Sequence, residues 1–215
     1  MKYVFAFLLA AITVTPAFSQ NLGFGVRAGS QGPGADVSIG ISSFLNIRVG
    51  GTTFSLAVPE ATLEDEDIDV VFSGEATLLT GSVMADLFPF QNGLRLTVGA
   101  TYNDSKVSVS GVPTSSYTVQ ARTFSQEEIG SLSAELGYEA SIRPYAGFGF
   151  GNPTRGSRVG LLFDAGVVFS GPPTISMSGT GMIAPTATEN EVVIQEALDG
   201  LKIFPVVSLG LSIRL

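Results

Sequence analysis

The chain has 215 residues, of which 45% are hydrophobic and 26 are glycine, with no cysteine, no histidine and a formal net charge of −8. The lack of cysteine excludes disulfides, thiolate metal sites and cysteine nucleophiles. So acidic a chain is also a poor match for nucleic acid, whose phosphates require a basic surface.

The first residues have the pattern of an export signal. Lys2 precedes an apolar run from Tyr3 to Val14, and Ala17-Phe18-Ser19 forms a small-x-small cleavage site. This pattern predicts a signal peptide over residues 1–19 and one domain over residues 20–215. The run is too short for a spanning helix, and no other segment approaches the roughly 20 apolar residues that such a helix needs.

The mature chain begins with strand patterns. Apolar residues alternate with small or polar ones over Leu22–Gly29 and again over 35–42, separated by Ser30-Gln31-Gly32-Pro33-Gly34. Period two predicts strands, and the Gly-Pro-Gly break favours a hairpin over one long strand. A third strand is expected from Asn46 to about Val58, and its apolar phase shifts after Thr53, where we expect a bulge or the edge of a membrane.

The middle of the chain continues the alternation. We expect residues 60–69 to form an exposed acidic loop and residues 68–88 to form a fourth strand, whose change of apolar phase predicts a β-bulge near Leu78-Leu79. Gln91-Asn92-Gly93 predicts a tight turn into a fifth strand over 94–103.

The last part of the chain predicts three more strands, over Leu136–Phe150, Val159–Phe169 and Val207–Leu215. Long connections are expected over about 110–133 and 171–202. Ser125-Gln126-Glu127-Glu128 has capping-box spacing, which predicts a turn of helix. We expect a short amphipathic helix over Glu189–Asp199, opened by a capping box at Thr188 and packing its apolar stripe on the loops or the barrel rim.

These elements predict the architecture. The strand number is eight, short and long connections alternate, and the closing strand has one apolar and one polar face. This is typical of an all-β fold, an eight-stranded antiparallel up-and-down transmembrane β-barrel with a short helix in the last long loop. A secreted soluble β-sandwich is the alternative, in which the apolar faces would meet each other.

Charged residues on the inward faces are predicted to form ion pairs, because an unpaired desolvated charge is costly. An eight-stranded barrel has an interior about wide enough to be filled by its own side chains. The predicted lumen network consists of Arg27, Asp36, Arg48, Glu75, Asp86, Arg95, Glu139, Arg143, Asp164 and Arg214. The alternative is a charged constriction that conducts small solutes.

Two further groups of residues predict how the protein meets its surroundings. An interfacial aromatic girdle is predicted near the short turns, from Phe44, Phe88, Phe90, Phe148 and Phe150. The acidic run Glu64, Asp65, Glu66 and Asp67 is a weak candidate for loose cation binding, but its spacing does not match an EF-hand. We expect a solvated loop there, and no bound metal or cofactor.

The closing strand VVSLGLSIRL, the inward Arg and acid pairs and the short-turn, long-loop rhythm resemble the small eight-stranded outer-membrane proteins of Gram-negative bacteria, the class that includes the OmpA membrane domain and OmpW. The resemblance implies a location in the outer membrane, with outer-membrane lipid and the barrel assembly machinery as partners. It leaves the oligomeric state open.

The filled lumen and the three sizeable loops favour a structural or loop-mediated role, and the resemblance to OmpW-like barrels suggests a small-solute or apolar-solute channel as the alternative. Enzymes built on such barrels rely on a histidine, and this chain has none. The compact polar set Glu139, Arg143 and Tyr145 is explained more simply by ion pairing, so we expect no enzymatic activity.

Overall fold

The computed structural model describes residues 21–64, 69–119, 122–138 and 141–215. The predicted signal peptide and the acidic residues 65–67 lie outside these ranges. The β-strands are β1 (Leu22–Gly29), β2 (Gly32–Gly40), β3 (Leu45–Glu64), β4 (Asp69–Leu87), β5 (Leu94–Asn103), β6 (Lys106–Pro113), β7 (Tyr117–Val119), β8 (Arg122–Phe124), β9 (Leu132–Gly137), β10 (Ser141–Phe150), β11 (Val159–Val168), β12 (Thr174–Gly179) and β13 (Phe204–Arg214).

Eight of these strands close into a ring, which confirms the predicted barrel. The order around the ring is β1, β2, β3, β4, β5, β10, β11 and β13, and β13 pairs with β1 to close it. All neighbours are antiparallel. Residues 22–42 form two strands joined at Ser30-Gln31, as the Gly-Pro-Gly break predicts.

The barrel presents apolar side chains outward. Val49 on β3, Val98 on β5, Leu161 on β11 and Leu209 on β13 are all exposed, and Leu161 reaches 73%. Alternate residues on the same strands are polar, and many of them are buried inside the ring. This is the inverse of a soluble barrel, because the apolar belt faces outward and the polar set fills the lumen.

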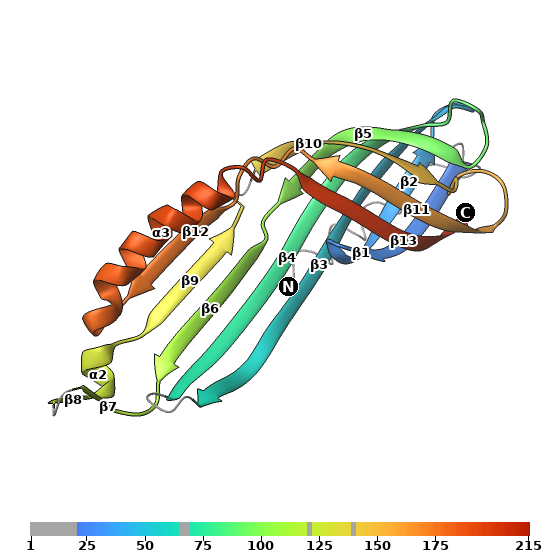
Figure 1. Cartoon of the computed structure of the whole chain (residues 1–215). Helices are drawn as coiled ribbons and strands as arrows, with labels where there is room; N and C mark the ends of the chain where they lie inside the picture. Colours follow the sequence, from blue (N-terminus) through green and yellow to red (C-terminus); the bar gives the residue numbers. More distant parts are fainter. Residues whose placement is uncertain (1–20, 65–68, 120–121, 139–140) are drawn as a thin grey trace.

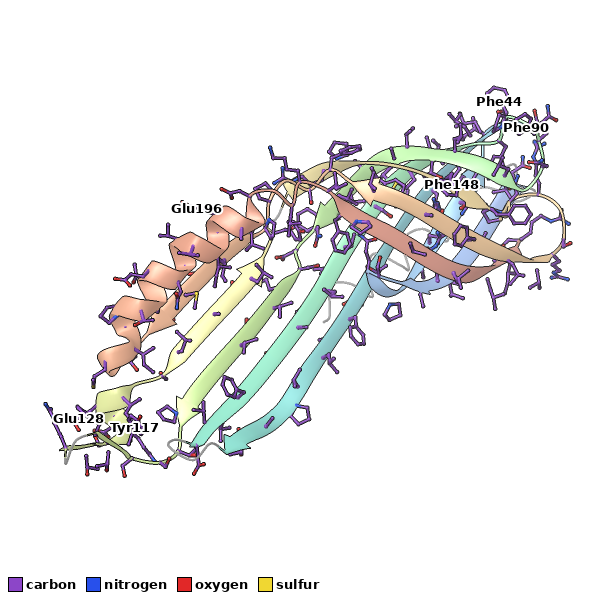
Figure 2. All side chains as sticks on the ribbon, in the orientation of Figure 1. Phe44, Phe90, Tyr117, Glu128, Phe148 and Glu196 are labelled. Atoms are coloured by element: carbon purple, nitrogen blue, oxygen red, sulfur yellow. The ribbon has the colours of Figure 1, made fainter. Side chains whose placement is uncertain are left out.

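One end of the barrel carries only short connections, and we call it the turn end. The turns at residues 41–44, 88–93 and 151–158 lie there, together with Leu215. Phe44, Phe90 and Phe148 are exposed around it, as Figure 2 shows. Phe150 is exposed as well, but the prediction for Phe88 is wrong, since Phe88 is fully buried and points into the barrel.

At the opposite end, β3 and β4 continue beyond the barrel into a second region of sheet, which we call the wing. It consists of residues 53–64 of β3, residues 69–79 of β4, and the strands β6, β9 and β12. Figure 1 shows these strands clear of the barrel, with β7 and β8 at the far tip. In their described residues, the expected loops at 60–69, 110–133 and 171–202 are therefore largely strand and helix.

The wing also divides the predicted sixth strand. Residues 132–137 form β9, which pairs with β6 and β12, while residues 141–150 form β10 in the barrel. The alternation of the two strands shares one phase, so the sequence shows no break between them. Their separation depends on pairing partners distant in sequence.

The change of apolar phase in β3 and β4 has a simple cause, and the predicted bulge at Leu78-Leu79 is wrong. Pairing of the two strands is unbroken from Leu45–Leu87 to Val58–Gly74. Even-numbered residues therefore stay on one side of the sheet throughout. That side is polar where it lines the lumen and apolar in the wing, because the sheet leaves the barrel at Thr53 and Leu79.

The wing has one apolar and one polar face. The apolar face, continuous with the lumen side, consists of Phe54, Leu56, Val58 and Ala61 on β3, Val70, Phe72, Ala76 and Leu78 on β4, Val107 and Val109 on β6, Leu132, Ala134 and Leu136 on β9, and Ile175 and Met177 on β12. The polar face carries Ser and Thr with a Lys106–Glu135 ion pair of 3.2 Å. The large apolar-face side chains on β3 and β6 are all exposed, by 39% to 52%.

Two helical segments accompany the wing. Helix α2 (Gln126–Ile129) has the predicted capping box, and the N–H of Ser125 donates to the Glu128 carboxylate, which lowers the pKa of Glu128 below its ordinary value. Helix α3 (Ala184–Leu198) follows the 3-10 turn η2 (Gly181–Ile183). It begins before the predicted position at Glu189, since Pro185 occupies the first turn, where no N–H donor is needed. Among the described residues, no helix has the length and hydropathy to cross a membrane.

Helix α3 covers the edge of β12 with polar side chains. The Glu191 carboxylate accepts the N–H of Met177 at 2.7 Å, and the Gln195 carbonyl oxygen accepts the N–H of Ile175 at 3.0 Å. The predicted apolar packing is wrong, since Val193 and Leu201 are exposed. An uncovered edge strand invites pairing with other chains, so α3 protects this edge.

The opposite edge of the wing is protected differently. The main-chain groups of odd-numbered β3 residues point toward β2, as the hydrogen bond from Ile41 N–H to the Leu45 carbonyl shows. In the wing, where β2 is no longer present, the same groups point toward the free edge of the sheet. Pro59, which lacks an N–H, falls in this set. The pairing with β4 shifts register between Val58 and Ala61. A proline and a bulge both discourage further strand pairing.

We predict that Glu191→Ala and Gln195→Ala each loosen the β12 edge. The amide hydrogens of Met177 and Ile175 should exchange faster with deuterium, and each change should cost about 1 kcal/mol, the typical value of one hydrogen bond. Glu196→Ala is the matched control, because Glu196 is exposed on the same helix (Figure 2). Equal exchange rates in all three variants would contradict the edge-cover role.

Candidate functional site: the closed lumen

The centre of the barrel holds a cluster of six charged residues, of which five are buried and Arg27 is partly buried. It consists of Arg27 on β1, Asp36 on β2, Arg48 on β3, Asp86 on β4, Arg95 on β5 and Asp164 on β11. We call this set the lumen cluster. Its three arginines and three aspartates cancel in charge.

Asp164 is the hub of the lumen cluster. Its carboxylate accepts from Arg95 Nη2 at 2.8 Å and from Arg48 Nη2 at 3.3 Å, and it also pairs with Arg27. Side chains from four strands therefore meet at one carboxylate. A buried carboxylate with three guanidinium partners is compensated for its loss of hydration.

Asp86 is the second junction. Its Oδ2 lies 2.9 Å from Arg48 Nε, and its Oδ1 lies 3.6 Å from Arg95 Nε. The Thr97 hydroxyl donates to Asp86 Oδ1 at 2.7 Å. The third acid, Asp36, pairs with Arg27. Every charge of the lumen cluster thus has a partner of opposite sign.

Glycines opposite the cluster leave room for these side chains. A Cβ on Gly25 would lie 2.9 Å from Asp36 Oδ1, and a Cβ on Gly149 would lie 3.0 Å from Arg95 Nε and from Asp164 Oδ1. The inward-facing glycines of the sequence pattern are therefore part of the site. They allow the long arginine side chains to cross a narrow lumen.

A floor closes the turn end of the barrel. The turn at residues 151–158 folds inward, burying Pro153 and Thr154. The Thr154 hydroxyl donates to Asn46 Oδ1 at 3.1 Å, and Asn46 Nδ2 donates to Asn152 Oδ1 at 3.1 Å. Arg95 donates to the Gly151 carbonyl, so the floor and the lumen cluster share one side chain.

Two features lie on the side of the lumen cluster that faces the wing. Met84, Tyr145, Val168 and Val206 form an apolar layer inside the barrel. Beside it lies a cavity of about 60 Å³ bordered by Arg27, Asp36, Thr52 and Gln31, among others. Each of these four residues has one buried polar atom without a protein partner. A polar cavity of this size holds only a few water molecules.

The structure brings six of the ten predicted network residues together, and these are the lumen cluster. Glu75 is exposed on the polar face of the wing, because without a bulge its side chain lies on the side of β4 opposite to Asp86. Arg143 and Arg214 are half-buried on β10 and β13, and within the described residues no carboxylate is in ion-pair distance of either. Glu139 lies outside the described residues.

Sequence reasoning missed the floor and the partners that complete the cluster. Thr97 reads as an ordinary inward threonine, and Asn152-Pro153-Thr154 reads as an ordinary turn. Only the fold shows that this turn enters the barrel. The described residues contain no group of three or more acidic side chains placed to hold a metal ion, and the acidic residues 65–67 lie outside them.

Two crystal structures of proteins from Acinetobacter baumannii share this fold. CarO2 is 20% identical over 90% of this chain and 98% of its own, with a TM-score of 0.60. CarO is 18% identical over 90% of this chain and 97% of its own, with a TM-score of 0.61. No family model and no curated protein matches the sequence. At such low identity, the likeness extends to the fold alone.

We predict strong coupling within the lumen cluster. Arg48→Ala and Asp86→Ala should each lower the free energy of unfolding by about 3 to 5 kcal/mol, because each leaves a buried charge without its partner. The double variant should lose clearly less than the sum of the two. Urea unfolding of the protein refolded in lipid vesicles measures these values.

Arg158→Ala is the control for this cycle. Arg158 is exposed in the turn at residues 151–158, so its removal should change stability by no more than about 0.5 kcal/mol. Strictly additive losses for Arg48 and Asp86 would show that the two side chains act independently.

Proposed function

We propose that this chain is an outer-membrane β-barrel whose lumen is closed to solutes and whose role is carried by the wing outside the membrane. The observation that carries the proposal is the double closure of the barrel, by the lumen cluster and by the floor. A filled eight-stranded barrel is a rigid anchor rather than a pore.

Three observations support the membrane setting. The outer face of the barrel is an apolar belt, exposed aromatic side chains lie at the turn end, and the fold is that of CarO, an outer-membrane protein of the eight-stranded barrel class. Outer-membrane lipid then covers the belt, and the assembly machinery inserts the barrel after export. In this setting the short turns face the periplasm and the wing faces the exterior.

A role in catalysis has little support. The chain has no histidine and no cysteine. The most deeply buried ionisable groups are already committed to ion pairs within the lumen cluster. We therefore propose that the protein acts by holding a surface outside the cell, and that it is not an enzyme.

Planar-bilayer recording of the refolded protein tests the closed lumen. We expect the wild-type protein to be silent. The variant R48A/D86A/R95A/D164A, which removes two charges of each sign, should give discrete conductance steps, because it empties the centre of the lumen and releases the floor from Arg95. A heat-modifiable gel shift verifies that each protein is folded.

Reproducible steps from the wild-type protein would overturn the closed lumen. They would favour a small-solute channel, with the arginines and aspartates of the lumen cluster as its selectivity residues. Silence of the four-site variant, if it is folded, would place the closure in the floor and the apolar layer instead.

Cysteine labelling tests the orientation, since the chain has no cysteine of its own. Tyr117→Cys at the tip of the wing should react with a membrane-impermeant maleimide on intact cells (Figure 2). Gln91→Cys at the turn end should react only after the outer membrane is opened. The reverse pattern would contradict the proposed orientation.

A further inference from the structure

The apolar face of the wing is the largest feature that the closed barrel does not explain. It spans β3, β4, β6, β9 and β12 and contains no charged side chain. Helix α3 packs beside it at β12, where Gly179 allows close approach of Ala184 and Ala187. Exposed apolar patches of this kind mark interaction surfaces.

The form of this face favours a flat partner. It belongs to an open sheet, whereas the polar pockets at the lumen and at Glu75 and Lys106 lie elsewhere. Small molecules bind in concave sites, whereas the apolar faces of two sheets pack directly on each other about 10 Å apart. The natural occupant is therefore a second apolar sheet.

We propose that this occupant is a second copy of the chain, and that two wings pack apolar face to apolar face outside the membrane. The edges of the wing are closed by α3, by Pro59 and by the bulge after Val58, so edge-to-edge pairing of two copies is disfavoured. The apolar face is then the part of the wing that remains open to a second copy. A two-fold contact requires a self-complementary surface, and an uncharged apolar face meets that condition.

The area is adequate for a stable pair. The four strands not occupied by α3, spaced about 4.8 Å apart with a rise of about 3.3 Å per residue over roughly eight residues, give about 500 Å² per copy. Two copies then bury about 1,000 Å² in total, which is the smallest area expected of a specific interface.

The geometry also permits both barrels to lie in one membrane, a step that depends on the proposed function. A two-fold axis parallel to the barrel axes leaves both barrels pointing in the same direction. Figure 1 shows the wing extending to one side of the barrel. Two wings can therefore meet while the barrels stay side by side, with their strands crossing between the two layers.

Cross-linking in isolated membranes tests this contact. Val109 lies on the apolar face of β6, the middle strand of the wing, and is 45% exposed. Val109→Cys with a short bismaleimide should give a band at twice the mass of the chain. Ser108→Cys, the neighbouring residue on the polar face, is the matched control and should stay monomeric.

Two outcomes would overturn the proposal. One is equal cross-linking of the two variants or none, and the other is capture by Val109→Cys of a different protein in place of a second copy. Quenching of Val109→Trp by brominated lipid would likewise assign the face to lipid, since the chain has no tryptophan of its own.

A second variant separates this result from misfolding. Val109→Glu should convert the dimer to a monomer in light scattering of the detergent-purified protein, while Ser108→Glu leaves the dimer intact. The heat-modifiable shift of each variant reports the barrel independently. If the wild-type protein shows the heat-modifiable shift but is monomeric, the dimer is refuted and the proposed function is not. If the wild-type protein shows no such shift, the proposed function is refuted.

Discussion

The contact of one carboxylate with three guanidinium groups holds the centre of this protein together. Asp164 on β11 faces Arg27 on β1, Arg48 on β3 and Arg95 on β5, so a single acidic side chain joins strands from all around the ring. A charge in that position is tolerable only if the partners arrive together. The pairing register of four strands is therefore coupled to one electrostatic constraint.

This constraint also explains the contrast between the barrel and the wing. Inside the ring, the inward residues of β3 and β4 are mostly polar, with Met84 as an exception, because they share an enclosed space with other polar groups. Beyond Thr53 and Leu79 there is no enclosure, and the same side of the same strands becomes apolar. The sheet is continuous, but its environment changes, and the residue pattern follows the environment.

Much of the barrel can be predicted from the sequence, because its determinants are local. Period-two alternation finds all eight ring strands, and the short turns at 91–93 and 151–157 are marked by glycine and asparagine. Six of the ten charged residues predicted to face inward lie in the lumen cluster, because inward-facing positions follow directly from the alternation. The prediction for Glu75 is wrong because it assigns the change of apolar phase to a bulge, whereas this change reflects the exit of β4 from the ring.

The wing and the floor could not be predicted for a different physical reason. Strands β6, β9 and β12 pair with partners far away in the chain, and alternation alone does not show which sheet a strand joins. The inward folding of Pro153 and Thr154 depends on Asn46, more than a hundred residues earlier. Helix α3 is held by polar contacts to a strand edge, so its apolar residues gave a misleading indication of its packing.

The closing pair of the ring has a consequence for the order of assembly. Strand β13 completes the barrel by pairing with β1, and these are the last and first of the described strands. Every segment of the wing lies between these two strands in the sequence. Because the finished lumen is filled by side chains, it offers no passage for a polypeptide. In the proposed orientation, the wing therefore has to reach the outer side of the membrane while the ring is still open, before β1 pairs with β13.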